Sequence, residues 1–260
     1  MYRSSISGFD SSFSTSYTTR GNATGTTRYL LTNGSVTGSV SGYAQYDIAG
    51  NVLKAIDARG YAINFDFNDR FGSPDYEAIG NTSPIELSSV GQASYASPTL
   101  VTNAANQTVY TQFDYYLGRP VNAQDPNGTV FASYYNEALD RPTQVIRDYN
   151  NASAKSQTIF SYDDAGRSIT TKSDQTSYGD NVLKGQAFYD GLGRTTETRQ
   201  YEQFGDDTKY IAMQTQYDAL SRAYRTSNPF RSWQSEVPIW TTTGFDTLSR
   251  VISVRHPTVP

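Results

Sequence analysis

The sequence predicts an all-β protein in which tandem antiparallel β-hairpins pair side by side into one extended, curled or spiralling sheet. Three observations lead to this fold class. The chain of 260 residues is 13% aromatic, with 21 tyrosines and 12 phenylalanines, although only 37% of it is hydrophobic. A six-residue motif recurs along most of its length, and a second turn signal follows that motif at a constant distance. Aromatic and β-branched side chains suit a pleated sheet, whereas helical bundles depend on Leu and Ala.

The motif reads aromatic-Asp-x-x-Gly-Arg, and eight strict or degenerate copies lie between Tyr46 and Arg250. The last four copies begin 27, 28 and 28 residues apart, and such regular self-similarity is the signature of a repeat architecture. Two copies, at Phe113 and Tyr135, carry one extra residue. The motif residues are Tyr46, Asp47 and Gly50; Phe65, Asp66 and Arg70; Phe113, Asp114, Gly118 and Arg119; Tyr135 and Arg141; Tyr162, Asp163, Gly166 and Arg167; Tyr189, Asp190, Gly193 and Arg194; Tyr217, Asp218 and Arg222; and Phe245, Asp246 and Arg250.

The residue types of the motif predict a tight hairpin. The aromatic residue ends one strand, and the aspartate caps a type I turn with its side chain. The Gly, Asn, Asp or Ser that follows takes a position with positive φ, and the arginine opens the return strand. This combination predicts a G1-type bulge. Asp and Arg flank the turn with opposite charges and can pair across it, and the arginine can stack on a neighbouring ring.

The second turn signal lies six residues after the end of the motif in several copies. Asp57, Asp125, Asn228 and His256 occupy this position, and Pro or Gly follows each of them within three residues. These residue types favour turns, so one unit is predicted to be strand, turn, strand, turn. A lone hairpin is marginally stable at best, and we therefore expect the units to pair into a shared sheet.

Two regions lie outside the regular repeats. Residues 1–40 are rich in Ser, Thr and Gly and contain Asn33-Gly34, a strong hairpin signal, so we expect a lead-in with a capping hairpin. Residues 41–260 form the predicted repeat sheet. Within it, residues 71–107 break the phase, which predicts a long loop or a degenerate unit. The sheet would have two unpaired edges, which either these two regions cover or self-association of the chain buries.

Composition excludes several kinds of chemistry. The net charge of −4 argues against a nucleic-acid partner. With no cysteine and one histidine, thiolate zinc sites, cysteine nucleophiles and disulfide scaffolds are absent, and no phosphate-binding or metal-loop motif appears. We expect no cofactor and no metal. No apolar stretch reaches the ~18 residues of a membrane span, and the first residues contain no signal peptide.

Two catalytic interpretations compete with a purely structural role for these residues. His256 falls on the turn position of its repeat, which favours a turn residue. A Ser-His-Asp triad through it would be the alternative, but no Gly-x-Ser-x-Gly elbow accompanies it. A glycosidase needs two carboxylates at a set separation. Seven of the aspartates share one repeat position, and a catalytic pair should stand out from a repeat instead of defining it. We therefore expect no enzyme activity.

The repeated motif resembles that of the bacterial RHS/YD-repeat proteins, whose relatives include the insecticidal toxin complex B and C subunits and the YD shell of teneurins. The resemblance covers about Tyr43 to Pro260. It implies a β-sheet strip that forms part of a hollow shell, which in large members encloses a toxic polypeptide. The family's core-terminating segment and variable toxin domain have no counterpart here, and its self-cleavage residues cannot be placed on this sequence. The chain is therefore expected to be a fragment of the repeat region, from a secreted or cell-surface parent.

The expected function is that of a non-catalytic shell segment that encapsulates or displays a toxin-like polypeptide. Its partners would be the rest of the parent RHS polypeptide or an encapsulated cargo. The alternative is a cell-surface carbohydrate-binding module, because YD-repeat proteins are associated with carbohydrate binding and sugar rings stack on exposed aromatic faces. Four aromatic residues outside the repeat phase would form the glycan platform: Tyr115, Tyr116, Trp233 and Trp240.

Overall fold

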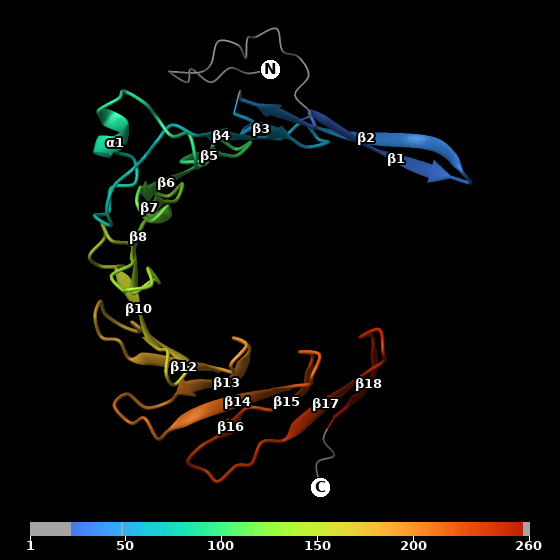
Figure 1. Cartoon of the computed structure of the whole chain (residues 1–260), viewed down its shortest axis with the longest axis vertical. Coiled ribbons are helices and arrows are strands. Elements are labelled where there is room, and N and C mark those ends of the chain that lie inside the picture. Colours follow the sequence, from blue (N-terminus) through green and yellow to red (C-terminus); the bar gives the residue numbers. More distant parts are fainter. Residues whose placement is uncertain (1–21, 48, 257–260) are drawn as a thin grey trace. The chain divides into compact units, whose positions relative to one another are not determined.

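The computed structural model describes residues 22–47 and 49–256 and shows an all-β protein (Figure 1). Its described part contains 18 strands and one four-residue helix, α1 (Ile85–Ser88). The chain divides into two compact units, which are described separately. The first comprises Met1–Tyr134 and Arg147–Ala152, and the second comprises Tyr135–Ile146 and Ser153–Pro260. Antiparallel hairpins pair side by side in both units, so the predicted fold class is confirmed.

The first unit is an antiparallel meander. Its eight strands pair with one another in chain order. The strands are β1 (Gly25–Thr32), β2 (Ser35–Tyr46), β3 (Val52–Ile56), β4 (Ala62–Asp66), β5 (Leu100–Thr102), β6 (Thr108–Asp114), β7 (Arg119–Gln124) and β8 (Val130–Tyr134).

The second unit continues the same pattern. Its strands are β9 (Gln144–Arg147, of which the last residue falls in the first unit), β10 (Ser156–Asp163), β11 (Ser168–Ser173), β12 (Leu183–Tyr189), β13 (Thr195–Tyr201), β14 (Tyr210–Tyr217), β15 (Ala223–Ser227), β16 (Phe230–Arg231), β17 (Trp240–Phe245) and β18 (Val251–Arg255). Sequential strands pair from β9 to β15. The short β16 pairs with β14, while β17 pairs with β15 and β18.

The hairpin turns have the geometry of the predicted G1-type bulge. In five hairpins the register slips by one residue where the motif aromatic begins to pair; these are β2–β3, β6–β7, β12–β13, β14–β15 and β17–β18. The residue before the last motif position has positive φ, for example 77° at Gly193 and 63° at both Ser221 and Ser249. The extra residue of each bulge is thus placed in the left-handed region that short or absent side chains tolerate.

Replacement of Gly193 by valine is expected to destabilise the protein by about 1–2 kcal/mol, because a β-branched side chain is strained at φ 77°. The melting temperature measures this loss. Gly193→Ser is the matched control, with a smaller effect, since serine occupies the equivalent position at Ser221 and Ser249. An unchanged melting temperature in Gly193→Val would contradict the turn geometry.

At Asp57 and Asp125 the second turn signal folds into the same turn as the motif, whereas the N–H of Asn228 donates to the carbonyl of Ile239 (2.8 Å), so the turn predicted there does not form. The N–H of Asp57 donates to the carbonyl of Tyr61 (2.9 Å), and the N–H of Gly60 donates to the carbonyl of Asp57 (3.0 Å). Asp190 and Arg194 are related in the same way, with the N–H of Gly193 donating to Asp190. Turns of the same five-residue type, each beginning with Asp, therefore occur at both ends of such a hairpin.

Two motif copies differ from the predicted hairpin. In the copy from Tyr162 to Arg167, the arginine itself takes the left-handed position (φ 49°), which in the regular hairpins belongs to the residue before the arginine; β11 then begins at Ser168. The N–H of Gly166 donates to the Asp163 carboxylate (2.8 Å), and a Cβ at Gly166 would clash with this carboxylate. This contact explains why glycine precedes the positive-φ residue in this copy.

The copy from Phe65 to Arg70 forms no hairpin, which corrects the sequence prediction. Strand β4 ends at Asp66 and pairs with the distant β5, not with a return strand that begins at Arg70. Asp69 stands where a turn residue was expected. Its carboxylate instead accepts hydrogen bonds from the N–H groups of Ser94 (2.6 Å) and Tyr95 (3.1 Å) and so holds the loop that precedes β5.

The two irregular regions have distinct structures. Asn33 (φ 52°) and Gly34 (φ 80°) form the turn of the β1–β2 hairpin, as expected for a type I′ turn, and all residues of β1 are exposed. Residues 1–21 of the predicted lead-in lie outside the described residues. Residues 71–107 form loops that contain α1 and β5.

The hydrophobic core is thin. Six apolar side chains are buried in the described part of the chain: Ala78, Val121, Val130, Ala132, Ile146 and Ala212. With so little buried apolar volume, contacts between neighbouring strands and turns must supply much of the stability. The most regular of these contacts involve the motif residues.

Candidate functional site

Three of the motif aspartates hold their turns through both carboxylate oxygens. Asp190 Oδ1 accepts the N–H groups of Leu192 (2.9 Å) and Arg194 (3.0 Å), and its Oδ2 accepts Arg194 Nε (2.6 Å). Asp218 with Arg222 and Asp246 with Arg250 repeat this arrangement. Each aspartate therefore caps its own turn and orients the arginine that closes it.

Two of these arginines, and Arg141 in the copy that begins at Tyr135, lie over the aromatic ring of the next hairpin. The guanidinium carbon is 4.0 to 4.7 Å from the ring centroid, within the range of a cation–π contact. We call these pairs the arginine clamps; they are Arg141 with Tyr162, Arg194 with Tyr217, and Arg222 with Phe245. The motif of one unit thereby contacts the motif of the next, so the repeat itself joins neighbouring hairpins.

Further hydrogen bonds close the clamps. Where the clamped ring is a tyrosine, its hydroxyl donates to the carbonyl of the residue after the arginine: Tyr162 to Pro142 (2.7 Å), and Tyr217 to Thr195 (2.9 Å). Arg194 Nη1 also donates to the Ser221 hydroxyl of the next turn (3.0 Å). The arginine thus connects three groups: its own aspartate, the neighbouring ring and the neighbouring turn.

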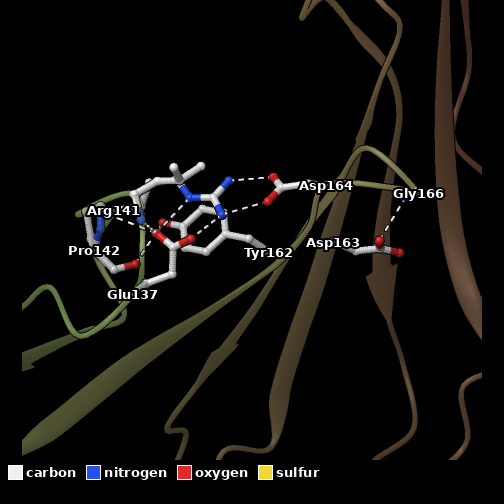
Figure 2. A network of polar contacts seen from close by, with 8 residues as sticks. Glu137, Arg141, Pro142, Tyr162, Asp163, Asp164 and Gly166 are labelled. Carbon is white, nitrogen blue, oxygen red and sulfur yellow. Dashed lines mark hydrogen bonds and ion pairs between the residues drawn. The ribbon is translucent and has the colours of Figure 1, made fainter.

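Figure 2 shows the clamp of Arg141, in which two carboxylates surround the guanidinium. Arg141 Nη2 donates to Glu137 Oε1 (2.5 Å), and Nη1 donates to Asp164 Oδ1 (2.6 Å). Glu137 takes the place of the motif aspartate here, because it begins the five-residue turn and accepts the N–H of Arg141. Glu137 was not among the turn carboxylates predicted from the sequence. Its position four residues before Arg141, the same spacing as in the Asp-Arg pairs, would have indicated this role.

Hydrogen bonds from the arginines lower the pKa of the turn carboxylates. The side chain of Arg141 lowers the pKa of Glu137 from 4.5 to about 2. The side chains of Arg194 and Arg222 likewise lower the pKa of Asp190 and of Asp218. A carboxylate whose pKa is lowered by folding stabilises the folded state above its unfolded pKa and loses that contribution as the pH falls through the folded pKa.

The melting temperature is expected to stay nearly constant from pH 7 to about 5.5 and to fall by several degrees between about pH 4.5 and 2. In this window the unfolded chain takes up protons that the folded Glu137, Asp190 and Asp218 resist. Melting curves measured across the pH range test this, with Glu137→Gln as the variant whose slope should be reduced. A profile that is equally steep in both proteins would contradict the role of Glu137.

The other motif residues lie outside the clamps. Arg70 Nη1 donates to the carbonyl of Ile79, and the guanidinium lies 5.5 Å from the ring of Tyr110. Arg119 opens β7 opposite Asp114, and Arg167 is exposed at its turn. Tyr46 donates its hydroxyl to the carbonyl of Ala23 (3.0 Å). In the hairpin of β2 and β3, Asn51 takes the place of the arginine, and its Nδ2 donates a hydrogen bond to the carboxylate of the buried Asp47 (3.0 Å).

The predicted glycan platform falls into two pairs, one in each unit. In the first unit, Tyr115 and Tyr116 are in edge-to-face contact (5.2 Å) and line a groove of about 260 Å³. Tyr116 is 73% exposed, and its hydroxyl donates to Glu86 Oε2 (3.2 Å). The charge of Glu86 raises the pKa of Tyr116. This groove combines an open ring face with polar groups.

The tryptophans of the second unit lie beside arginines. Trp240 has Arg225 over its ring (4.7 Å) and lines a hollow of about 520 Å³ together with Tyr217 and Tyr224. Trp233 lies 6.0 Å from Arg231 and does not line this hollow. The four predicted aromatic residues therefore do not line one common surface hollow: Tyr115 and Tyr116 line the groove of the first unit, and of the two tryptophans only Trp240 lines the hollow of the second.

Comparison with known proteins gives a likeness of fold. No protein-family model and no curated protein matches the chain. Among solved structures, the chain is similar to a pore structure of the Photorhabdus luminescens Tc holotoxin that carries a TccC3 mutation. The two chains share 12% sequence identity, and the TM-score is 0.54. The alignment covers 88% of this chain and 11% of that chain. The chain is also similar to TcdB2-TccC3, with 15% identity, 89% and 14% coverage, and a TM-score of 0.54. The chain has an RHS/YD-shell-like fold.

The likeness lies in backbone geometry and not in sequence, because only 12% and 15% of the aligned residues are identical. The chain spans only 11% and 14% of the two solved chains, so the likeness concerns a stretch of the sheet. Within the described residues, no helix is long and apolar enough to cross a membrane. The same residues contain no cluster of three or more potential metal ligands.

Proposed function

We propose that this chain is non-catalytic wall material, a segment of an RHS/YD-type shell that encapsulates or displays a partner polypeptide. The observation that supports this most directly is the series of arginine clamps, in which motif residues bind one another across neighbouring hairpins. The fold likeness to Tc toxin structures supports the same proposal.

The chemistry of the motif carboxylates favours a structural role over catalysis. A general acid or base works best when its pKa lies near the working pH. The arginines instead lower the pKa of Asp190 and Asp218, which makes these groups poor proton donors at neutral pH. Their oxygens are also occupied by backbone N–H and guanidinium donors. The proposal places the parent protein at the cell surface or in the secreted fraction.

The encapsulating role is tested by fusing a short unstructured reporter peptide to the C-terminus of the full chain and adding a non-specific protease. A wall segment that holds a polypeptide should extend the reporter's half-life several-fold over the same reporter on an unrelated monomeric β-protein. Gly193→Val, which weakens one turn, should reduce the protection. Equal half-lives on both carriers would show that the chain does not hold the reporter.

A carbohydrate-binding function is the second candidate, favoured by the groove beside Tyr115 and Tyr116. Calorimetric titration with a panel of oligosaccharides tests it, and Tyr116→Ala should abolish any specific binding that uses this groove. Tyr61→Ala is the matched control, because Tyr61 is also largely exposed in the first unit but does not line the groove. Trp233→Ala and Trp240→Ala test the second unit in the same titration.

A further inference from the structure

The groove beside Tyr115 and Tyr116 combines aromatic rings with carboxylates. It has a volume of about 260 Å³ and lies within the first unit, between the loop that follows β4 and the turn that joins β6 to β7. Its rings and carboxylates belong to Phe71, Tyr115, Tyr116, Asp75 and Asp114. The rest of its lining consists of Gly, Ser, Thr and one Pro. The lining therefore offers acceptors and ring faces but no cationic side chain.

Backbone hydrogen bonds hold the groove in shape. The N–H of Gly72 donates to the carbonyl of Phe113 (3.0 Å), which fastens the loop to the end of β6. The N–H of Thr82 donates to the carbonyl of Phe71 (2.7 Å), and the N–H of Phe71 donates to Asn81 Oδ1 (2.9 Å). Because the loop is closed upon itself before a ligand arrives, binding requires little further ordering of the chain.

The three rings of the groove stand at steep angles to one another. The ring of Tyr115 is nearly perpendicular to that of Phe71 (85°) and to that of Tyr116 (83°), with 5.2 Å between the centroids in each pair. The face of an aromatic ring attracts a cation through its partial negative charge. The hydroxyl of the exposed Tyr116 donates to the carboxylate of Glu86 (3.2 Å), which adds a full negative charge beside the groove.

The two carboxylates that line the groove each use only one oxygen. Asp114 Oδ1 accepts the N–H groups of Tyr116 and Leu117 (2.9 Å each). Asp75 Oδ1 accepts the N–H of Glu77 (3.1 Å) and the amide of a buried asparagine (3.1 Å). Neither Oδ2 accepts a hydrogen bond from the described residues, and no described lysine or arginine forms an ion pair with either aspartate. The groove thus carries negative charge that the chain does not balance.

We propose that this groove binds the primary ammonium group of a lysine side chain from a partner polypeptide. The ammonium has three N–H donors, which suit the carboxylate oxygens and hydroxyls of the lining, and the alkyl stem packs against the rings. Charge complementarity favours this occupant over a neutral sugar, which would leave the carboxylates without a counter-charge. The inference deepens the proposed wall function, on which it rests, because it names a side chain by which a displayed polypeptide is held.

An NMR titration of the full chain tests the inference, with a Gly-Lys-Gly peptide blocked at both ends as the probe. We expect saturable shifts of the Tyr116 and Leu117 N–H signals and a Kd of about 1 mM. The same peptide with norleucine, which has a methyl group in place of the ammonium, should bind at least about ten-fold more weakly. Asp114→Asn should weaken lysine binding by about ten-fold, because the amide oxygen still caps the turn but the charge is lost.

Asp57→Asn is the matched control for Asp114→Asn. Asp57 Oδ1 accepts the N–H groups of Arg59 and Tyr61 (2.9 Å each), so this aspartate also caps a turn of the first unit, but it does not line the groove. Loss of its charge should leave the affinity within about two-fold. Melting curves should show that both variants stay folded.

Tyr116→Ala separates a lysine from a sugar. An exposed cation–π contact contributes little, so this change should weaken lysine binding by only about three-fold, whereas a sugar ring that stacks on Tyr116 would be lost with it.

Three results would overturn the proposal. Two are equal binding of the lysine and norleucine peptides, and an affinity that Asp114→Asn leaves unchanged. The third is a glucosamine trimer that binds more tightly than the peptide and displaces it, which would assign the groove to an amino sugar. None of these results bears on the wall function, which the protease experiment tests separately. Lysine binding without protection of the reporter would remove the wall function and leave the groove as a lysine site.

Discussion

Replacement of Asn122 by alanine is expected to lower the free energy of unfolding of the first unit by about 3 kcal/mol. The Asn122 side chain is 1% exposed and lies between β7 and the loop that follows β4. Its Nδ2 donates to the Ser73 carbonyl (2.6 Å) and Gln112 Oε1 (2.7 Å), and its Oδ1 accepts the N–H of Tyr76 (3.1 Å). Alanine would leave these groups buried without partners and open a small cavity.

Chemical denaturation measures this loss, and hydrogen exchange locates it. The N–H of Tyr76 should lose protection in Asn122→Ala, together with its neighbours in residues 71–82. Asn127→Ala is the matched control, because Asn127 is exposed and its side chain makes no hydrogen bond recorded in the structure. If residues 71–82 kept their protection in Asn122→Ala, other contacts would have to hold this loop.

Replacement of Arg222 by alanine is expected to cost about 2 kcal/mol and to lower the melting temperature by about 4–8 °C. The change removes the ion pair with Asp218 (2.7 Å), the contact with the ring of Phe245 (4.7 Å) and the hydrogen bond to the Asp246 carbonyl (3.2 Å). Because these contacts join two hairpins, their loss should loosen β17 and β18 as well as the turn that contains Arg222.

Arg250→Ala is the internal control for this prediction. Arg250 occupies the same motif position and makes the same ion pair, but it contacts no neighbouring ring within the described residues. An exposed ion pair contributes at most about 1 kcal/mol, so Arg250→Ala should have the smaller effect in melting experiments. Arg222→Lys should not restore stability, because lysine lacks the planar fork that contacts carboxylate and ring together. Equal effects of Arg222→Ala and Arg250→Ala would show that the ring contact contributes nothing.

The clamps explain how a protein with a thin core keeps its sheet together. Among the second unit's residues that the structure describes, only Ile146 and Ala212 are buried apolar side chains, yet this unit contains all three clamps. Each clamp combines a desolvated ring face with a guanidinium whose charge a carboxylate balances. Stability of this kind adds up from one neighbour to the next, as in other repeat proteins, and allows a wall to be extended hairpin by hairpin.

Much of the local structure could be predicted because it depends on short-range chemistry. An aspartate that caps a turn and a small residue at positive φ act within five residues, so Asp190 to Arg194 could be interpreted without knowing the rest of the chain. The prediction failed where distant residues compete for the same groups. Asp69 binds Ser94 and Tyr95 instead of closing a turn, and Glu137 replaces an aspartate in a copy whose spacing had shifted.

The sequence by itself determined that this protein is all-β, that its unit is a hairpin, and which residues close the turns of the regular copies, because turn geometry and strand alternation follow from residue types a few positions apart. The tertiary structure alone decided which arginine meets which ring, because that depends on strand register between hairpins. It also revealed Asn122 as the anchor of a loop about 45 residues away in sequence, and among the described residues it placed no ring beside Arg250. These outcomes are set by which chain segments become neighbours in space, and no local pattern contains that information.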